Sequence, residues 1–157
     1  MVTIEKYTPV RYESVSALSV LEEQSQFTVA DIGDMLNSLK STELPHLIVM
    51  DDLVVGFFLF DTDYCDSYDF CPENSLGVRA LLLDHRFQGQ GIAKQAIRQF
   101  ADFARCHFPA FQALYLTVNF RNTVAYQCYL KAGFEDTGEL YLGGPVGPQH
   151  IMKQSLT

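Results

Sequence analysis

The segment from Leu81 to Lys94 constrains the fold of this chain more than any other part of the sequence. An apolar strand that ends at Leu83 leads into a turn containing Gly89 and Gly91, and an amphipathic helix begins directly after the second glycine. Glycine accepts backbone dihedrals that a Cβ atom opposes, so this turn can gather several backbone N–H groups at the positive end of a helix dipole. The pattern predicts an anion-binding site suited to a phosphate or pyrophosphate.

Two motifs that the chain lacks narrow the identity of this phosphate ligand. A Walker loop ends in Gly-Lys-Ser or Gly-Lys-Thr, which occurs nowhere in the sequence. A dinucleotide fingerprint needs a third glycine where this chain has Lys94. The spacing of Gln88, Gly91 and Ala93 instead resembles the first signature of the GNAT superfamily of acetyl-CoA-dependent N-acetyltransferases, Q/R-x-x-G-x-G/A.

A second signature follows downstream, after an apolar run at 113–118 that predicts a buried strand. The chain here resembles the GNAT pattern N-x-x-A-x-x-x-Y-x-x-x-G-F, whose specified positions are filled by Asn122, Ala125, Tyr129, Gly133 and Phe134. We expect Asn122 to cap this helix and Gly133 to end it. Because Asn122 and Tyr129 lie two helical turns apart, both can face one groove. The resemblance covers about residues 46–156.

The order of the predicted elements is also that of the GNAT fold. Hydrophobic periodicity predicts strands at 2–7, 47–50, 53–59, 76–83, 113–118, 139–142 and 150–154, and helices at 12–23, 28–41, 91–106 and from 122 onward. The resemblance therefore implies an α/β fold, with one GNAT domain over residues 1–157. Its central sheet is expected to be mixed, splayed and mostly antiparallel, with six to seven strands and about four helices on both faces.

Composition limits the class of protein and its partners. A chain of 157 residues, 48% of them hydrophobic, can bury one compact core. No apolar run is long enough to span a bilayer, so we expect a cytoplasmic protein without a membrane partner. The four cysteines form no C-x-x-C pair, which favours reduced thiols and no metal site. A formal net charge of −8 argues against a nucleic-acid partner. The resemblance leaves a homodimer open.

The resemblance implies acetyl-CoA as a cosubstrate, held in a cleft where two strands separate. The pyrophosphate would lie on the backbone amides of residues 88–93, with a side-chain contact from Lys94. The pantetheine arm would pair with the strand at Leu81 and Leu83, and Asn122 would bind it from the opposite wall. The residues expected to contact acetyl-CoA are therefore Leu81, Leu83, Gln88, Gly89, Gln90, Gly91, Ile92, Ala93, Lys94, Asn122 and Tyr129.

The same resemblance assigns a catalytic role to Tyr129. An unprotonated amine attacks the thioester directly, and the phenol, with an ordinary pKa of about 10, protonates the departing thiolate. The alternative is a tyrosine whose ring only packs and whose hydroxyl meets solvent. The general base stays open, because many relatives place a glutamate about where this chain has Arg79. We expect three histidines to be ordinary surface or loop residues: His46, His85 and His150.

An acidic segment at 61–73 suggests the chemistry of the acceptor. It holds five carboxylates, three aromatic residues and no basic residue. Carboxylates and aromatic faces attract ammonium groups, and the spacing looks similar to that of bacterial spermine/spermidine acetyltransferases. This favours a di- or polyamine, or another small cationic amine, as the acceptor. The residues expected to bind it, or to act as the base, are Glu22, Glu23, Asp61 and Asp63. The alternative is a solvated acidic loop with no role in binding.

Three functions remain open from the sequence. An acetyl-CoA-dependent amine N-acetyltransferase comes first. A catalytically silent acyl-CoA-binding regulatory protein on the same fold comes second, because Arg79 occupies the place of a common base. A nucleotide-binding α/β protein comes third, and the missing Walker and dinucleotide motifs disfavour it.

Overall fold

A seven-stranded sheet forms the centre of the computed structural model, which describes residues 1–20 and 31–157. In chain order the strands are β1 (Val2–Lys6), β2 (Glu43–Met50), β3 (Leu53–Asp61), β4 (Ser75–Leu83), β5 (Ala113–Asn119), β6 (Glu135–Tyr141) and β7 (Gln149–Ser155). Their spatial order is β1-β2-β3-β4-β5-β7-β6. Among the strand pairs of residues 1–20 and 31–157, β4–β5 alone is parallel. The expected mixed, mostly antiparallel sheet is therefore confirmed.

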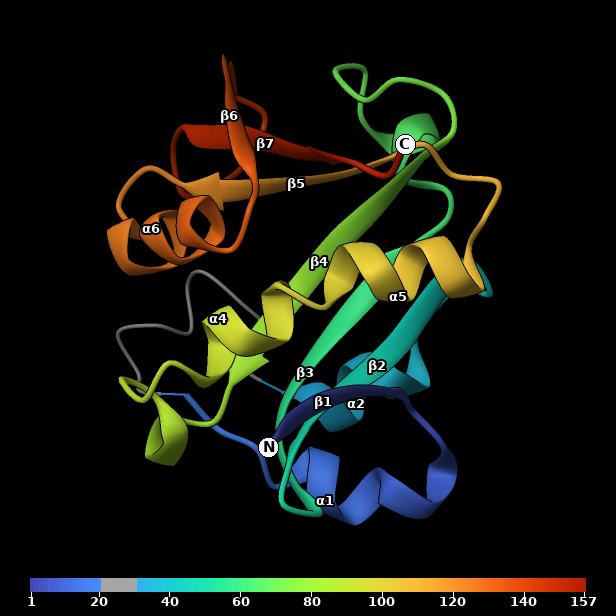
Figure 1. The fold of residues 1–157 in the computed structure, drawn as a ribbon, viewed down its shortest axis with the longest axis vertical. Coiled ribbons are helices and arrows are strands. Elements are labelled where there is room, and N and C mark those ends of the chain that lie inside the picture. The colour runs from blue at the N-terminus through green and yellow to red at the C-terminus, as the bar shows by residue number, and fades with distance from the viewer. Residues whose placement is uncertain (21–30) are drawn as a thin grey trace.

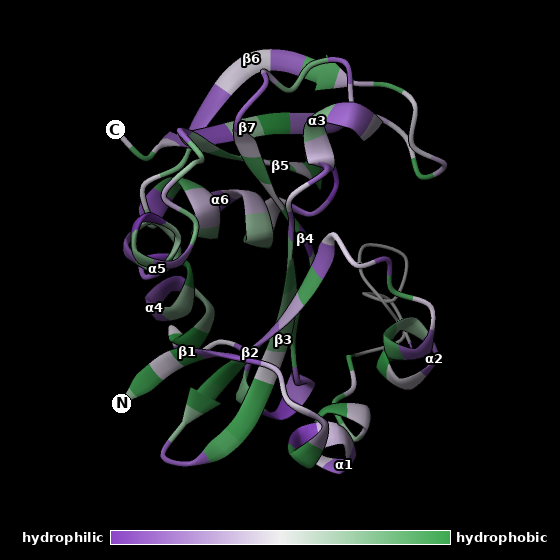
Figure 2. Cartoon of the chain, turned by 90° about the vertical axis from the view of Figure 1, so that its right-hand side faces the viewer, coloured by the Kyte–Doolittle hydropathy of each residue, from purple (hydrophilic) through white to green (hydrophobic). Residues whose placement is uncertain are grey.

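Helices cover both faces of this sheet, as expected (Figures 1 and 2). They are η1 (Pro9–Arg11), α1 (Tyr12–Ser16), α2 (Ile32–Asn37), α3 (Tyr64–Ser67), η3 (His85–Phe87), α4 (Ile92–Ile97), α5 (Phe100–His107) and α6 (Thr123–Lys131). Figure 2 shows α1 and α2 on one side of β3 and α4 and α5 on the other. The core is accordingly divided, with one apolar cluster under α4 and α5 and a second under α1 and α2. None of the helices in the described ranges has the length and apolar character needed to cross a bilayer.

The helix expected at 91–106 is two helices, α4 and α5, separated at Arg98 and Gln99. The backbone N–H of Gln99 donates to the carbonyl oxygen of Ala96, three residues back, which tightens the turn. The Gln99 side chain meanwhile donates to the Val2 carbonyl oxygen on β1 at 2.8 Å. The apolar face continues through the break, so hydrophobic spacing alone predicted a single helix.

Other element boundaries also differ from the expected ones. Of the helix expected at 28–41, the described residues contain α2, which Asp31 caps at its start and the Ser38 hydroxyl closes by bonding to carbonyl oxygens at its end. Of the helix expected at 12–23, the described residues contain α1, which ends at Ser16. Residues 21–23 and 28–30 of these expected helices lie outside the described part of the chain. Strands β2 and β6 each begin four residues before the apolar run that predicted them, because their added residues are mostly polar or partly exposed and so fall outside the apolar pattern.

The sheet opens between β4 and β5, which confirms the expected splay. The two strands pair only from Ser75 opposite Ala113 to Gly77 opposite Tyr115, although both continue beyond these residues. Further along β4, the register with β3 shifts around Ala80, which has a positive φ of 56°. This bulge bends β4 while β5 runs straight on, and the two strands diverge visibly in Figure 1.

His46 lies in the larger apolar cluster rather than at the surface, so the expectation of a surface or loop histidine is wrong for it. The residue sits in β2 and is 2% exposed, and its Nδ1–H donates to the Leu44 carbonyl oxygen at 2.8 Å. Its ring centroid lies 5.0–5.3 Å from those of Phe58, Phe60 and Phe103. Burial among these rings lowers the pKa of His46 to about 4.

This buried imidazole predicts a loss of stability in mild acid. An unfolded histidine titrates near pH 6.5, whereas the folded one stays neutral until about pH 4. The free energy of unfolding should therefore fall as the pH drops from 6.5 to 4, by at most about 3 kcal/mol. Urea unfolding at pH 7 and pH 4.5 measures this. His46→Phe should flatten the profile in this window, while His107→Gln, a change at an exposed position that removes only the smallest contribution to the low His46 pKa, should retain most of it. Equal losses in wild type and His46→Phe would contradict the assignment.

Candidate active site

A cleft of about 800 Å³ occupies the space where β4 and β5 separate. Its walls include all but one of the residues expected to contact acetyl-CoA: Leu81, Leu83, Gln88, Gly89, Gly91, Ile92, Ala93, Lys94, Asn122 and Tyr129. The exception is Gln90, whose side-chain amide donates to the Arg86 carbonyl oxygen at 3.3 Å and is not part of the lining. The fold therefore brings together two signatures that are far apart in the sequence.

The turn between β4 and α4 has the backbone conformation that its glycines predict. Gly89 and Gly91 have φ angles of 76° and 77°, in the left-handed region that side chains other than glycine rarely adopt. A Cβ atom at Gly89 would meet nothing within 4 Å, and one at Gly91 would meet only the Gln95 amide at 4.0 Å. The turn is thus uncrowded at both glycines, which line the cleft at the start of α4. The Gln88 amide braces it by donating to the Leu83 carbonyl oxygen at 2.9 Å.

Helix α6 forms the opposite wall and has the ends that the sequence predicts. Asn122 caps it, with Oδ1 accepting the backbone N–H of Ala125 at 3.4 Å. At the other end Gly133 has a φ of 114°, and the backbone N–H of Phe134 donates to the Tyr129 carbonyl oxygen at 3.0 Å. The Gly133 N–H bonds one residue further along the helix, as in a Schellman motif. These bonds define both ends of α6, and Asn122 and Tyr129 on this helix both line the cleft.

Tyr129 is buried but lines the cleft. The residue is 6% exposed, and its ring packs edge-on against Phe134 with 5.6 Å between centroids. Burial raises the pKa of the Tyr129 phenol above its ordinary value. The phenol is therefore neutral at physiological pH and carries a proton on the cleft wall.

The charged residues that line the cleft in the described ranges are all cations: Arg79, Lys94 and Arg121. Arg79, on β4, pairs with two carboxylates, which leaves this three-residue cluster with a net charge of −1. One of its terminal nitrogens lies 3.0 Å from Glu43 Oε2 on β2 and 3.2 Å from Asp61 Oδ2 on β3. This ion pair links three neighbouring strands just before the β4 bulge at Ala80.

The expected role of two acidic residues in acceptor binding is not supported by their positions. The Asp61 side chain is 4% exposed, and its carboxylate is used by Arg79 and by the backbone N–H of Asp63 at 2.9 Å. Neither Asp61 nor Asp63 lines the cleft. The physical reason is that Asp61 ends β3 beside Arg79, and so it stabilises the sheet rather than facing a ligand. Glu22 and Glu23 lie outside the described residues.

Sequence reasoning missed several residues of the lining: Tyr64, Tyr68, Thr117, Cys128 and Gln149. Tyr64 lies in α3, a short helix within the acidic segment, and packs directly on Gly77 of β4. A Cβ atom at Gly77 would overlap the Tyr64 ring. A glycine inside a strand often marks such a close approach, so Gly77 was the available signal.

The histidines do not contribute to the cleft lining in the described ranges. His85 lies in η3 with a 41% exposed side chain, as expected. His150 instead lies in β7, between the rings of Phe120 and Tyr126 at centroid distances of 4.3 and 4.1 Å. Its Nδ1 is 3.3 Å from Asp136 Oδ2, so the expectation of a loop histidine is wrong here.

Comparison with known families agrees with this geometry. The sequence profile described as "Acetyltransferase (GNAT) family" matches residues 12–134. The chain belongs to the acetyltransferase (GNAT) family. The match includes both signatures, and the expectation of an acetyl-CoA-dependent N-acetyltransferase is confirmed at the level of the family.

One related sequence and two similar solved structures extend this comparison. It is 28% identical over 158 residues to the uncharacterized N-acetyltransferase YbbJ of Bacillus subtilis, and the match covers 99% of this chain and 98% of the relative. The aminoglycoside acetyltransferase AAC(6′)-Ib, solved with paromomycin and acetyl-CoA, superimposes with a TM-score of 0.79 at 19% identity, over 98% of this chain and 93% of the other. The ribosomal-protein-S18-alanine N-acetyltransferase of Escherichia coli gives 0.68 at 13% identity, over 100% and 95%. These two likenesses show the shared fold.

Proposed function

We propose that the protein transfers the acetyl group of acetyl-CoA to a primary amine of a small acceptor, in the cleft between β4 and β5. The observation that carries this proposal is the convergence of three groups on one cleft: the glycine turn after β4, the Asn122 cap and the protonated Tyr129 phenol. The turn can bind the pyrophosphate of acetyl-CoA, the amide can bind its arm, and the phenol can donate a proton to the sulfur of its thioester.

The residues present fit acetyl-CoA. The pyrophosphate would accept hydrogen bonds from the backbone N–H groups of residues 88–93, where the two left-handed glycines leave open space. Lys94 lines the same wall and adds a positive charge. The pantetheine arm would then run along β4 at Leu81 and Leu83, facing Asn122 on the other wall. The Asn122 amide uses Oδ1 for the helix cap, and its Nδ2 can donate to the arm.

The chemistry requires one carbon–nitrogen bond to form and one carbon–sulfur bond to break. The amine lone pair attacks the thioester carbonyl carbon, the thiolate leaves, and one amine proton ends on the thiol. Tyr129 would relay this proton, by donating to the sulfur and recovering a proton from the acylated nitrogen. Because burial raises the Tyr129 pKa, the phenol is a weaker acid than the thiol, so its proton must move as the carbon–sulfur bond breaks.

The described part of the cleft supplies no carboxylate or imidazole to act as a base. Deprotonation of the amine by bulk water, before it binds, is therefore the route that fits these residues. The reactive species would be the fraction of the acceptor that arrives as a free amine.

A cationic amine, such as a polyamine, stays our proposal for the acceptor class. Two observations bear on it in opposite directions. The aromatic rings of Tyr64 and Tyr68 on the cleft wall can stabilise an ammonium group, which supports the proposal. The two carboxylates beside Arg79, Glu43 and Asp61, leave this cluster with a net charge of −1 but do not line the cleft, so the described wall presents a cation no carboxylate to contact.

A thiol-release assay with a mixed panel of amines tests both levels of this proposal. The panel contains spermidine, spermine, an aminoglycoside, neutral amines and amino acids, each with acetyl-CoA. We expect amine-dependent thiol release, with the polyamines preferred. Preference for neutral or acidic amines would remove the cationic-acceptor proposal and leave the transferase. In parallel, acetyl-CoA at 100 times its Kd should stabilise the protein by about 2.7 kcal/mol. Stabilisation without turnover for any amine would favour the silent acyl-CoA-binding protein.

A further inference from the structure

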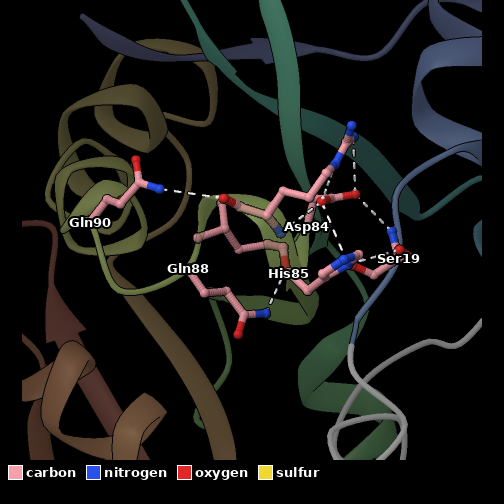
Figure 3. Close-up of polar contacts among 7 residues, drawn as sticks. Ser19, Asp84, His85, Gln88 and Gln90 are labelled. Atoms are coloured by element: carbon pink, nitrogen blue, oxygen red, sulfur yellow. Dashed lines mark hydrogen bonds and ion pairs between the residues drawn. The ribbon is translucent and has the colours of Figure 1, made fainter.

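A buried carboxylate ties the end of β4 to a distant part of the chain. Asp84 follows β4 directly and is 1% exposed. Its Oδ2 accepts the backbone N–H of Ser19 at 3.0 Å, and the backbone N–H of His85 donates to the Ser19 carbonyl oxygen at 2.8 Å (Figure 3). The Ser19 hydroxyl also lies 3.1 Å from Nδ1 of His85. Ser19 is thus held through its N–H, its carbonyl and its side chain by two consecutive residues.

The same carboxylate also holds the turn that leads to the glycines. Asp84 Oδ1 accepts the backbone N–H of Arg86 at 3.0 Å and the Arg86 Nε–H at 2.9 Å. Burial alone would raise the pKa of Asp84, but the hydrogen bonds from Arg86 and Ser19 lower it below its ordinary value. Asp84 is therefore ionised at neutral pH, with donors from two segments around it. Two glutamine amides brace the rest of the turn, donating to the carbonyl oxygens of Leu83 and Arg86 (Figure 3).

Both segments held by Asp84 border the same cleft. Val20, the residue after Ser19, lines the cleft, and so do Gln88 and the glycines that follow the braced turn. Their positions depend on one carboxylate, because Asp84 is the group at which the two sets of hydrogen bonds meet. A shift of the turn on ligand binding would therefore be transmitted to Ser19 and to the cleft wall at Val20.

We propose that Asp84 is a positioning residue that couples coenzyme A binding at the glycine turn to the order of Ser19 and Val20 on the cleft wall. The proposal rests on the proposed function in that it takes the glycine turn as the coenzyme A site. It goes beyond that function because binding at the glycine turn would then change the order of Ser19 and Val20, which lie far from the turn in the sequence. The coupling is reciprocal, so a ligand that orders Ser19 and Val20 also tightens coenzyme A binding.

Hydrogen exchange measured by mass spectrometry tests this coupling on the full chain, with coenzyme A itself as the probe. In wild type, saturating coenzyme A should slow amide exchange both at residues 86–93 and at Ser19 and Val20, the latter by about fivefold or more. In Asp84→Asn the amide side chain turns a donor toward either Ser19 or Arg86. Protection at 86–93 should then persist at saturation, while the ligand-dependent protection at Ser19 and Val20 is lost.

Two further variants complete the design. Arg86→Ala changes an exposed side chain and keeps the Asp84–Ser19 bond, so it carries the test if Asp84→Asn does not fold; it should reduce the ligand-dependent protection at Ser19. Asp102→Asn is the matched control, since Asp102 is exposed on α5 and pairs with Arg105; it should behave as wild type. In the amine assay, Asp84→Asn should raise the KM for acetyl-CoA more than it lowers kcat.

The outcomes separate the coupling from the function on which it rests. If coenzyme A protects residues 86–93 but leaves exchange at Ser19 and Val20 unchanged in wild type, the coupling is wrong and the proposed function stands. Ligand-dependent protection at Ser19 that survives in both Asp84→Asn and Arg86→Ala also overturns the coupling. If coenzyme A protects neither segment, the proposed function itself fails.

Discussion

Replacing Tyr129 with phenylalanine lowers kcat by about 100- to 10,000-fold and leaves the affinity for acetyl-CoA near that of wild type. The substitution removes one hydroxyl from a buried ring that packs on Phe134, so the wall of the cleft keeps its shape. What is lost is the proton that would reach the departing sulfur. Steady-state kinetics with the best amine of the panel, together with a binding isotherm for acetyl-CoA, measure the two effects separately.

Tyr126→Phe is the matched control for this experiment. Tyr126 lies on the same helix, but its hydroxyl donates to Asp136 Oδ2 at 2.7 Å, away from the cleft lining. Its loss should cost about 1 kcal/mol of stability and leave kcat unchanged. A kcat for Tyr129→Phe within fivefold of wild type would falsify the assignment of the general acid.

The second large effect is expected at Gly91. Gly91→Val should raise the Kd for acetyl-CoA by about 100-fold or more, because several charge-assisted hydrogen bonds to the pyrophosphate are lost together. Gly91 has a φ of 77°, where a β-branched side chain is strongly disfavoured, and its missing Cβ faces open space in the cleft wall. The valine would distort the turn and add a branched side chain to the lining of the cleft. Isothermal titration with acetyl-CoA gives the affinity directly.

Gly138→Val is the matched control, because it introduces the same backbone strain as Gly91→Val at a position outside the cleft. Gly138 has a φ of 83° and nothing within 4 Å of its missing Cβ atom, but it lies in β6, outside the lining of the cleft. Both valine variants should lose about 1–2 kcal/mol of stability from the left-handed conformation. Only Gly91→Val should lose affinity, and an unchanged Kd in that variant would count against the glycine turn as the acetyl-CoA site.

The parts of the site that the sequence predicted are those fixed by local chemistry. A glycine that must adopt a positive φ, an asparagine that caps a helix and a glycine that ends one each depend on a few neighbouring residues. Gly91, Asn122 and Gly133 therefore have the conformations expected of them. The splay of the sheet followed from the family resemblance and from the strand order rather than from any single residue.

The parts that the sequence did not predict depend on contacts between distant strands. Asp61 belongs to an acidic segment, and only the register of three strands shows that it pairs with Arg79. His46 precedes the apolar run of its strand, and its burial follows from β2 beginning earlier, beneath the rings of α5 and β3. The coupling through Asp84 joins residues 65 positions apart, and no local pattern marks it.

The short parallel pairing of β4 with β5 has a mechanical consequence. Only three pairs of residues join these strands, from Ser75 opposite Ala113 to Gly77 opposite Tyr115, so the sheet consists of two half-sheets connected near one end by a short hinge. The angle between β4 and β5 at this hinge then sets the width of the cleft at its far end. A small change in this angle produces a larger change in width, because β4 extends well beyond the hinge. Substitutions at Gly77 or Tyr64, where a ring is wedged against the hinge, can therefore alter catalysis by changing the angle between the halves. A ligand that contacts both half-sheets holds them at a fixed angle, so the whole sheet is more rigid when the cleft is occupied.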